Sequence, residues 1–151
     1  MEKGTDSMVE DKNAFQYFKE ILGIEHASPE SYSPLALAYI GDSVFDVMIR
    51  TMEVSKGNKQ VNKYHKDVSR IVCAPAQAKM ILALKDQLTE EEYAIYKRGR
   101  NANSYTKAKN ASRTDYRKAT GFEALLGYLY LKEDFNRLTD LVKMGLEALE
   151  S

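Results

Sequence analysis

The sequence predicts an all-α protein with one domain, on the basis of three observations. Apolar residues recur at the three- and four-residue spacing of helices along most of the chain. No run of β-branched residues alternates at the two-residue spacing of a strand. A length of 151 residues, 44% of them hydrophobic, is enough for one core and too little for two domains. We therefore expect a flexible tail over 1–12, which has no helical periodicity, and a single domain over 13–151.

The composition restricts the class of protein. The 22 basic and 22 acidic residues give a formal net charge of zero, so the chain as a whole is no general binder of nucleic acid. Cys73 is the single cysteine and cannot form an internal disulfide, which favours a reducing compartment and a place in the core. No apolar run is long enough to cross a bilayer, and the first residues are too polar for a signal peptide. We expect a cytoplasmic protein that does not contact a membrane.

The first two helices are indicated by their end signals. Apolar residues within 15–22 are spaced as one face of a short helix, which Gly23 ends. A longer helix begins after Ser33, a favoured N-cap, has Pro34 in its first position, and continues through Arg50. This central helix is apolar on more than one side, so one side can face the core and the other a partner.

Three more helices are expected after Gly57. The second of them opens at Pro75, and the third begins at a capping box formed by Thr89 and Glu92. The first has a histidine on its apolar stripe, which we interpret as a core residue rather than a catalytic group. The stripe consists of Val61, His65, Val68 and Val72.

The last two helices complete the bundle. The first of them starts near Asp115 and contains Gly121 and Gly127, whose cost in helix propensity is usually compensated by the close approach of another backbone. We therefore expect this helix to pack tightly on a neighbour. The inward residues of the final helix are expected to be Phe135, Leu138, Leu141, Val142 and Leu149.

Two carboxylates stand within apolar helices. Asp42 lies in the middle of the central helix, and Glu123 lies in the run 122–131. An ionised acid that is removed from water is costly unless it is paired, hydrogen-bonded or bound to a metal. If the two helices cross, either a proton or a divalent cation relieves the repulsion between the acids. Oxygen ligands favour Mg²⁺, with Mn²⁺ as a plausible substitute, and such a site can hydrolyse a phosphodiester.

The residues by themselves leave alternatives open for these acids. Each could instead be merely hydrogen-bonded, for instance to Tyr39, to Tyr128 or to a helix end. Asp46 lies one turn after Asp42 on the same face, and it either helps to orient the site or has a surface or capping role.

A basic segment precedes the Glu123 helix. From Lys97 to Lys118 the chain has eight basic residues and one acid, interspersed with amides and hydroxyls. These groups contact the phosphates and ribose hydroxyls of RNA, so we favour a polyanion-binding segment over a solvated loop. The candidate RNA-binding residues are Arg98, Arg100, Asn101, Asn103, Lys107 and Lys109.

Two motifs resemble those of the ribonuclease III family. Residues 37–44 read Leu-Ala-Tyr-Ile-Gly-Asp-Ser-Val, which is similar to the family's Leu-Glu-Phe-Leu-Gly-Asp-Ala-Val. Residues 122–131 read Phe-Glu-Ala-Leu-Leu-Gly-Tyr-Leu-Tyr-Leu, which resembles its Phe-Glu-Ala-Leu-Ile-Gly-Ala-Ile-Tyr-Leu. The similar stretch runs from about residue 33 to residue 131, and no double-stranded-RNA-binding domain follows it. With the basic residues at 97–104, the chain resembles the Mini-ribonuclease III branch of the family.

The resemblance implies a function and a site. It implies a homodimeric, all-α endoribonuclease that cleaves double-stranded RNA, with Asp42 and Glu123 as catalytic residues and Mg²⁺ ligands. It also implies a dimer built about the central helix and a role in maturing 23S ribosomal RNA precursor in bacteria. The expected dimer-interface residues are Leu37, Ile40, Gly41 and Val44.

The chain departs from the family pattern at three acidic positions, which are here Leu35, Ala38 and Thr120. The two remaining ligands suffice for one hydrated ion, while the loss permits a rival function, a catalytically silent RNA-binding module of the same fold. Retention of Asp42 and Glu123 argues against that rival. A helical nucleotide pyrophosphohydrolase is a second rival, but it needs acids at Glu-x-x-Glu spacing, which the central helix lacks.

Overall fold

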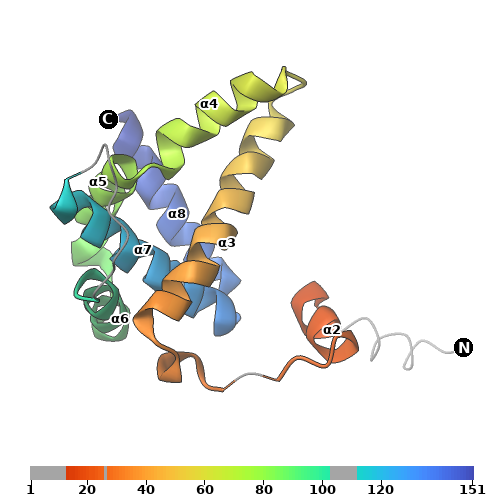
Figure 1. The fold of residues 1–151 in the computed structure, drawn as a ribbon, viewed down its shortest axis with the longest axis vertical. Helices are drawn as coiled ribbons and strands as arrows, with labels where there is room; N and C mark the ends of the chain where they lie inside the picture. The colour runs from red at the N-terminus through yellow and green to blue at the C-terminus, as the bar shows by residue number, and fades with distance from the viewer. Residues whose placement is uncertain (1–12, 26, 103–111) are drawn as a thin grey trace, which may run out of the picture.

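The chain folds into a bundle of helices, as the sequence predicts (Figure 1). The computed structural model describes residues 13–25, 27–102 and 112–151, and these ranges contain helices and turns but no strand. The tail expected over 1–12 lies outside them. None of the described helices is long and apolar enough to cross a membrane. The elements are α2 (Ala14–Ile21), η1 (Pro29–Ser31), α3 (Pro34–Ser55), α4 (Val61–Val72), α5 (Ala74–Leu84), η2 (Lys85–Gln87), α6 (Glu90–Arg100), α7 (Arg113–Leu131) and α8 (Phe135–Glu150).

Helix α3 is the central helix predicted from the sequence. The Ser33 side chain accepts a hydrogen bond from the Ala36 amide, and Pro34 occupies the first turn, so both start signals are confirmed. Helix α7 crosses α3 within the core (Figure 1). The rings of Phe45 and Phe122 meet edge to face there, with their centroids 5.7 Å apart.

Glycines bring the backbones of α3 and α7 into contact. A Cβ atom on Gly41 would lie 1.8 Å from the Glu123 carbonyl oxygen, and one on Gly127 would lie 1.9 Å from the Leu37 carbonyl oxygen. Neither position can accept a side chain without separating the helices. The close approach expected at Gly127 is therefore confirmed. The sequence had not indicated that Gly41 is its counterpart on α3.

Helix α6 packs on α7, and helix α8 packs mainly on α5. The predicted capping box is present, since Thr89 and Glu92 bond to each other's backbone amides. Glu92 is buried and also accepts two hydrogen bonds from Arg137 of α8, each 2.8 Å long. A buried, bidentate ion pair thus joins these two helices.

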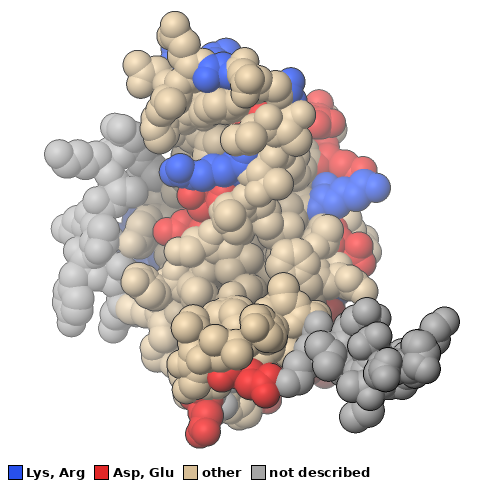
Figure 2. Space-filling model, turned by 90° about the vertical axis from the view of Figure 1, so that its right-hand side faces the viewer, with Lys and Arg blue, Asp and Glu red and all other residues tan. Residues whose placement is uncertain are grey.

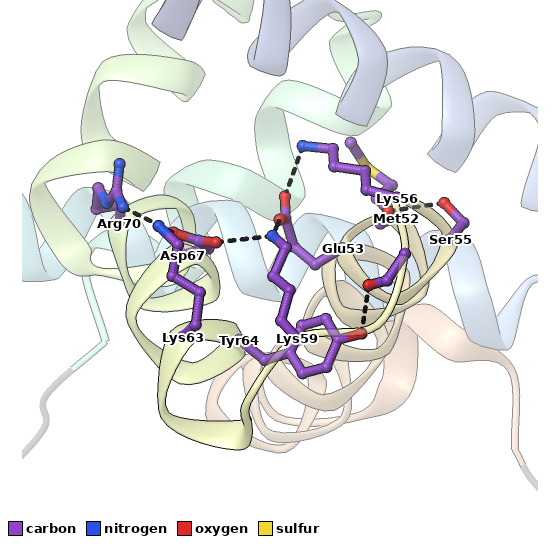
Figure 3. Close-up of polar contacts among 10 residues, drawn as sticks. Met52, Glu53, Ser55, Lys56, Lys59, Lys63, Tyr64, Asp67 and Arg70 are labelled. Carbon is purple, nitrogen blue, oxygen red and sulfur yellow. Dashed lines mark hydrogen bonds and ion pairs between the residues drawn. The ribbon is translucent and has the colours of Figure 1, made fainter.

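A network of ion pairs closes the turn between α3 and α4 (Figure 3). Glu53, with 4% of its surface exposed, pairs with Lys56 at 2.9 Å and with Lys59 at 3.3 Å. Lys59 also reaches Asp67 of α4 at 2.8 Å, so one ammonium group bridges the two helices. Lys63 and Arg70 complete the pairing of Asp67.

Several expectations about burial were wrong. His65 is exposed, because the inward side of α4 is centred on Val68 and the start of α4 lies beyond the core. Cys73 is exposed in the extended link between α4 and α5. Phe135 is 50% exposed, because it is the first residue of α8 and precedes the part of that helix that packs inward.

Candidate active site

The crossing of α3 and α7 brings together the two acids singled out from the sequence. Asp42 directly follows Gly41, and Glu123 lies one turn before Gly127, so both flank the glycine contact. Their carboxyl groups lie within hydrogen-bonding reach of each other. The crossing assumed from the sequence is therefore confirmed.

The environment of Glu123 opposes its ionisation. Burial and the adjacent Asp42 carboxylate raise the pKa of Glu123 to about 8 from an ordinary value of 4.5. Near neutral pH and without a cation, the pair therefore carries about one negative charge instead of two. A divalent cation between the two groups would restore the second charge.

Asp42 is more accessible than its sequence context suggests. Its side chain is exposed in the described chain, whereas we expected it to be removed from water. The reason is that α7 covers the adjacent side of α3, on which Gly41 lies, and leaves the side of Asp42 open. One carboxylate of the pair is thus half-buried and the other faces solvent, which is an arrangement that a substrate can approach.

The donor set is small. In the described part of the chain, no group of three or more His, Cys, Asp or Glu residues is placed to hold a metal ion. Thr120, one turn before Glu123, is buried and donates its hydroxyl to the Tyr116 carbonyl. Two carboxylates fit one Mg²⁺ ion that keeps several of its waters, which is how this ion is usually held.

Sequence reasoning missed Gln77, the hydrogen-bond partner of Glu123. The Gln77 side-chain amide, on α5, donates to Glu123 Oε2 at 3.2 Å. Neither tyrosine considered from the sequence has this role, since Tyr128 donates to Glu91 and Tyr39 is 81% exposed. The available signal was an amide in a helix that is otherwise rich in Ala, Leu and Met.

Asp46 takes part in a surface ion pair. Its carboxylate lies 2.7 Å from Arg50, one turn further along α3. This contact supports the surface role that the sequence left open for Asp46. A role in orienting the site stays a prediction.

The basic segment has two kinds of arginine. Arg98 donates to the carbonyl oxygens of Tyr32 and Glu30, at 3.1 and 3.4 Å, and so ties α6 to the chain that leads into α3. Arg100 instead lies over the ring of Tyr96 and donates to Asn101. The other three RNA-binding candidates, Asn103, Lys107 and Lys109, lie outside the described residues.

A basic cavity lies between the end of α6 and the start of α7. Its volume is about 170 Å³. Three cationic side chains line it with two neutral polar ones, and the structure records no ion pair between these cations and a described acid. The lining residues are Arg100, Asn101, Thr114, Arg117 and Lys118.

The residues expected at a dimer interface face the core of their own chain. Leu37 is fully buried, Val44 is buried, and Gly41 contacts the α7 backbone, while Ile40 is partly buried against Gly127. Because α7 covers this side of α3, these residues leave little surface for a partner, and their place in a dimer stays a prediction. The exposed apolar residues of α3 lie elsewhere on the helix, and the face of the molecule drawn in Figure 2 is mostly uncharged, with scattered acidic and basic side chains. The exposed apolar residues of α3 are Leu35, Tyr39, Val47, Met52 and Val54.

The chain is similar to known ribonucleases. The ribonuclease III domain profile matches residues 35–134, which include both acids. Mini-ribonuclease 3 of Clostridium tetani is 45% identical over 135 residues, which span 87% of this chain and 89% of the relative. Mini-ribonuclease 3 of Enterococcus faecalis is 49% identical over 117 residues, which span 76% of this chain and 89% of the relative.

A solved structure has the same fold. Protein FN1578 from Fusobacterium nucleatum superimposes with a TM-score of 0.72 at 24% identity, over 81% of this chain and 98% of that one. The chain therefore belongs to the ribonuclease III family and, within it, to the Mini-ribonuclease 3 group. It is an endoribonuclease that acts on double-stranded RNA.

Proposed function

We propose that this chain cleaves duplex RNA with Mg²⁺ held by Asp42 and Glu123. One observation carries the proposal: two carboxyl groups lie within hydrogen-bonding reach of each other, and the pKa of one of them is raised to about 8. Such a pair loses stability when both groups are ionised, and a divalent cation offsets that loss. The two acids lie on different helices, so the glycine contact between α3 and α7 fixes the spacing of the ligands.

The role of each group follows from its place. When bound, Mg²⁺ supplies positive charge beside the scissile phosphate and lowers the pKa of a coordinated water. Asp42 faces solvent and would hold the ion from the open side of α3, while the half-buried Glu123 would hold it from the side of the core. Mn²⁺ has the same preference for oxygen ligands and should substitute for Mg²⁺.

RNA backbone binding is assigned to the basic cavity and the residues beside it. Arg100, Arg117 and Lys118 have no acidic partner among the described residues, so their charges are available to phosphates. Asn101 and Thr114 add neutral hydrogen-bonding groups. Asn103, Lys107 and Lys109 are candidates for further contacts to the same duplex, whereas Arg98 already has two carbonyl partners.

The biological substrate and the assembly extend this proposal. We infer that the substrate is 23S ribosomal RNA precursor in the bacterial cytoplasm, because the motifs and the relatives are those of Mini-ribonuclease 3. We also infer a homodimer that places two cleavage sites on opposite strands of a duplex. The exposed apolar residues of α3 provide surface for such a contact, in place of the buried residues first considered.

The test is cleavage of a defined RNA duplex by the purified chain. We expect cleavage in Mg²⁺, none in excess chelator, and recovery when Mg²⁺ is restored. Asp42→Asn should bind the duplex without cutting it, while Asp46→Asn, one turn along α3, should still cut because its carboxylate pairs with Arg50. Cleavage in chelator, or by Asp42→Asn at the wild-type rate, would contradict the metal assignment. Binding without cleavage by the wild-type chain would identify the RNA-binding module instead.

A further inference from the structure

Gln77 connects the candidate active site to the junction of α4 and α5. Its side chain is almost fully buried, with 1% of the residue surface exposed. The amide nitrogen donates to two acceptors, the Val72 carbonyl oxygen at 2.8 Å and Glu123 Oε2 at 3.2 Å. Val72 is the last residue of α4, so one amide group joins the end of that helix to a carboxylate on α7.

The two acceptors determine the orientation of the amide. A primary amide has two N–H groups, and both are used here. Rotating the amide by half a turn would direct its oxygen at a carbonyl and a carboxylate, which are both acceptors. In the orientation that fits, Gln77 Oε1 is buried and has no hydrogen-bond partner among the described residues.

An unpartnered buried oxygen lowers the stability of the fold. An apolar residue of similar length would avoid that loss and would suit its surroundings, since the other inward residues of α5 include Met80, Ile81 and Leu84. Packing by itself therefore gives no reason for an amide at this position. An apolar residue could replace neither of the two hydrogen bonds, and the bond to Glu123 is the one that reaches the candidate active site.

We propose that Gln77 is a positioning residue, whose amide holds the Glu123 carboxylate in the orientation that binds the metal ion. The inference rests on the proposed function, because it assumes that Glu123 is a metal ligand. A carboxylate fixed through one oxygen keeps a single direction for the other, so less conformational freedom is lost when the ion binds. The junction of α4 and α5 holds Gln77 in turn, through the Val72 carbonyl.

Binding of Mn²⁺ alone, without RNA, tests this role. Loss of the electron paramagnetic resonance signal of free Mn²⁺ gives the dissociation constant, and thermal unfolding without metal gives the melting temperature. Gln77→Met removes the donor and the unpartnered oxygen while keeping the length of the side chain. Leu84→Met, a volume-conserving change at a buried position of the same helix, is the matched control. Glu123→Gln reports whether the metal site itself is correctly placed.

We expect Gln77→Met to weaken Mn²⁺ binding about tenfold, the loss typical of residues that orient a ligand. Its melting temperature without metal should stay within about 3 °C of wild type, since removing the unpartnered oxygen offsets the lost bond to Val72. Leu84→Met should bind Mn²⁺ like wild type.

Other outcomes overturn specific claims. Wild-type Mn²⁺ affinity in Gln77→Met, or an equal loss in Leu84→Met, would show that Gln77 does not position the ligand. A Gln77→Met chain that fails to fold would show that the amide is needed for the fold. Unchanged Mn²⁺ binding in Glu123→Gln would instead contradict the proposed function, whatever Gln77 does.

Discussion

Two acids of this protein are buried in opposite ways. Glu53, at the end of α3, pairs with two lysines, and the ammonium of Lys56 does most to hold its pKa below the ordinary value. Glu123, on α7, has Asp42 as its charged neighbour, and burial together with this carboxylate raises its pKa instead. Glu53 is buried and Glu123 is half-buried, yet the charge of Glu53 is satisfied by the protein and that of Glu123 is not.

The difference shows which feature identifies a site. Burial of an acid is common to both regions and indicates nothing by itself, since Glu53 and Glu92 are buried structural groups. What distinguishes Glu123 is that the nearby charged group repels it. The uncompensated repulsion between the Asp42 and Glu123 carboxylates marks this pair as a candidate place for a cation.

The largest expected effect is a difference in RNA cleavage between variants of Glu123 and of Glu53. We expect Glu123→Gln to lower duplex cleavage in Mg²⁺ about a thousandfold or more, because a ligand for the ion is lost. Glu53→Gln should cleave at near the wild-type rate while melting at a lower temperature. Single-turnover cleavage and thermal unfolding of both variants provide the measurement. Full cleavage activity in Glu123→Gln would show that Glu123, like Glu53, is not needed for cleavage.

Removing the partner of a satisfied acid should affect stability. Arg137→Met leaves the buried Glu92 unpaired, and we expect the free energy of unfolding to fall by about 3 kcal/mol. Lys132→Met breaks the exposed pair with Glu91 and should cost less than about 1 kcal/mol. Urea unfolding at neutral pH measures both. An equal decrease in the free energy of unfolding of both variants would show that burial does not determine how much each ion pair stabilises the fold.

A smaller effect should appear in the pH dependence of stability. Glu123 binds its proton more tightly in the folded chain, so its contribution to stability is present below about pH 4.5 and is lost as pH rises toward about 8. Gln at position 123 does not ionise, so Glu123→Gln avoids this loss of stability at high pH. Without metal, the variant should melt about 4 °C above wild type at pH 8. At pH 4.5 the two melting temperatures should agree more closely.

Thermal unfolding in chelator across this pH range provides the measurement. A difference in melting temperature that grows as pH falls would contradict the raised pKa. Added Mg²⁺ should narrow the gap at pH 8 by stabilising the wild-type chain alone.

The smallest effect concerns cations that have no acidic partner in the part of the chain that the structure describes. Replacing Arg117 and Lys118 by Gln should weaken RNA binding for every sequence and reduce the slope of log affinity against log salt by about one unit per lost contact. Lys132→Gln, whose ammonium pairs with Glu91, should leave that slope unchanged. Filter binding at several salt concentrations distinguishes them. An unchanged slope in the double variant would show that the basic cavity does not contact phosphate.

The sequence predicted the elements of the fold and the principal acids. End signals such as Ser33 with Pro34 and the capping box at Thr89 are local, so they can be read without knowing the tertiary structure. Asp42 and Glu123 were conspicuous as charges in apolar runs, and Gly127 correctly indicated a close helix contact.

The features that the sequence did not predict depend on which side of each helix is covered by a neighbouring helix. Gln77, the exposed position of Asp42 and the burial of Leu37 within its own chain all follow from how α7 and α5 lie against α3. Periodicity identifies an apolar face but does not say which neighbour covers it, so an amphipathic helix and a dimer contact have the same pattern. The prediction that His65 is a core residue was wrong for the same reason, since the start of α4 extends past the core.

The contact of Gly41 and Gly127 ties the site to the cooperativity of the fold. The two acids become neighbours only when α3 and α7 dock, so the site forms in the same step as the largest part of the core. An ion held across this crossing would bind the folded state alone, and its binding energy would add directly to the free energy that keeps the two helices together. Amide hydrogen exchange in α3 and α7 should therefore slow together when a divalent ion is added, while exchange at the far end of α8 should not.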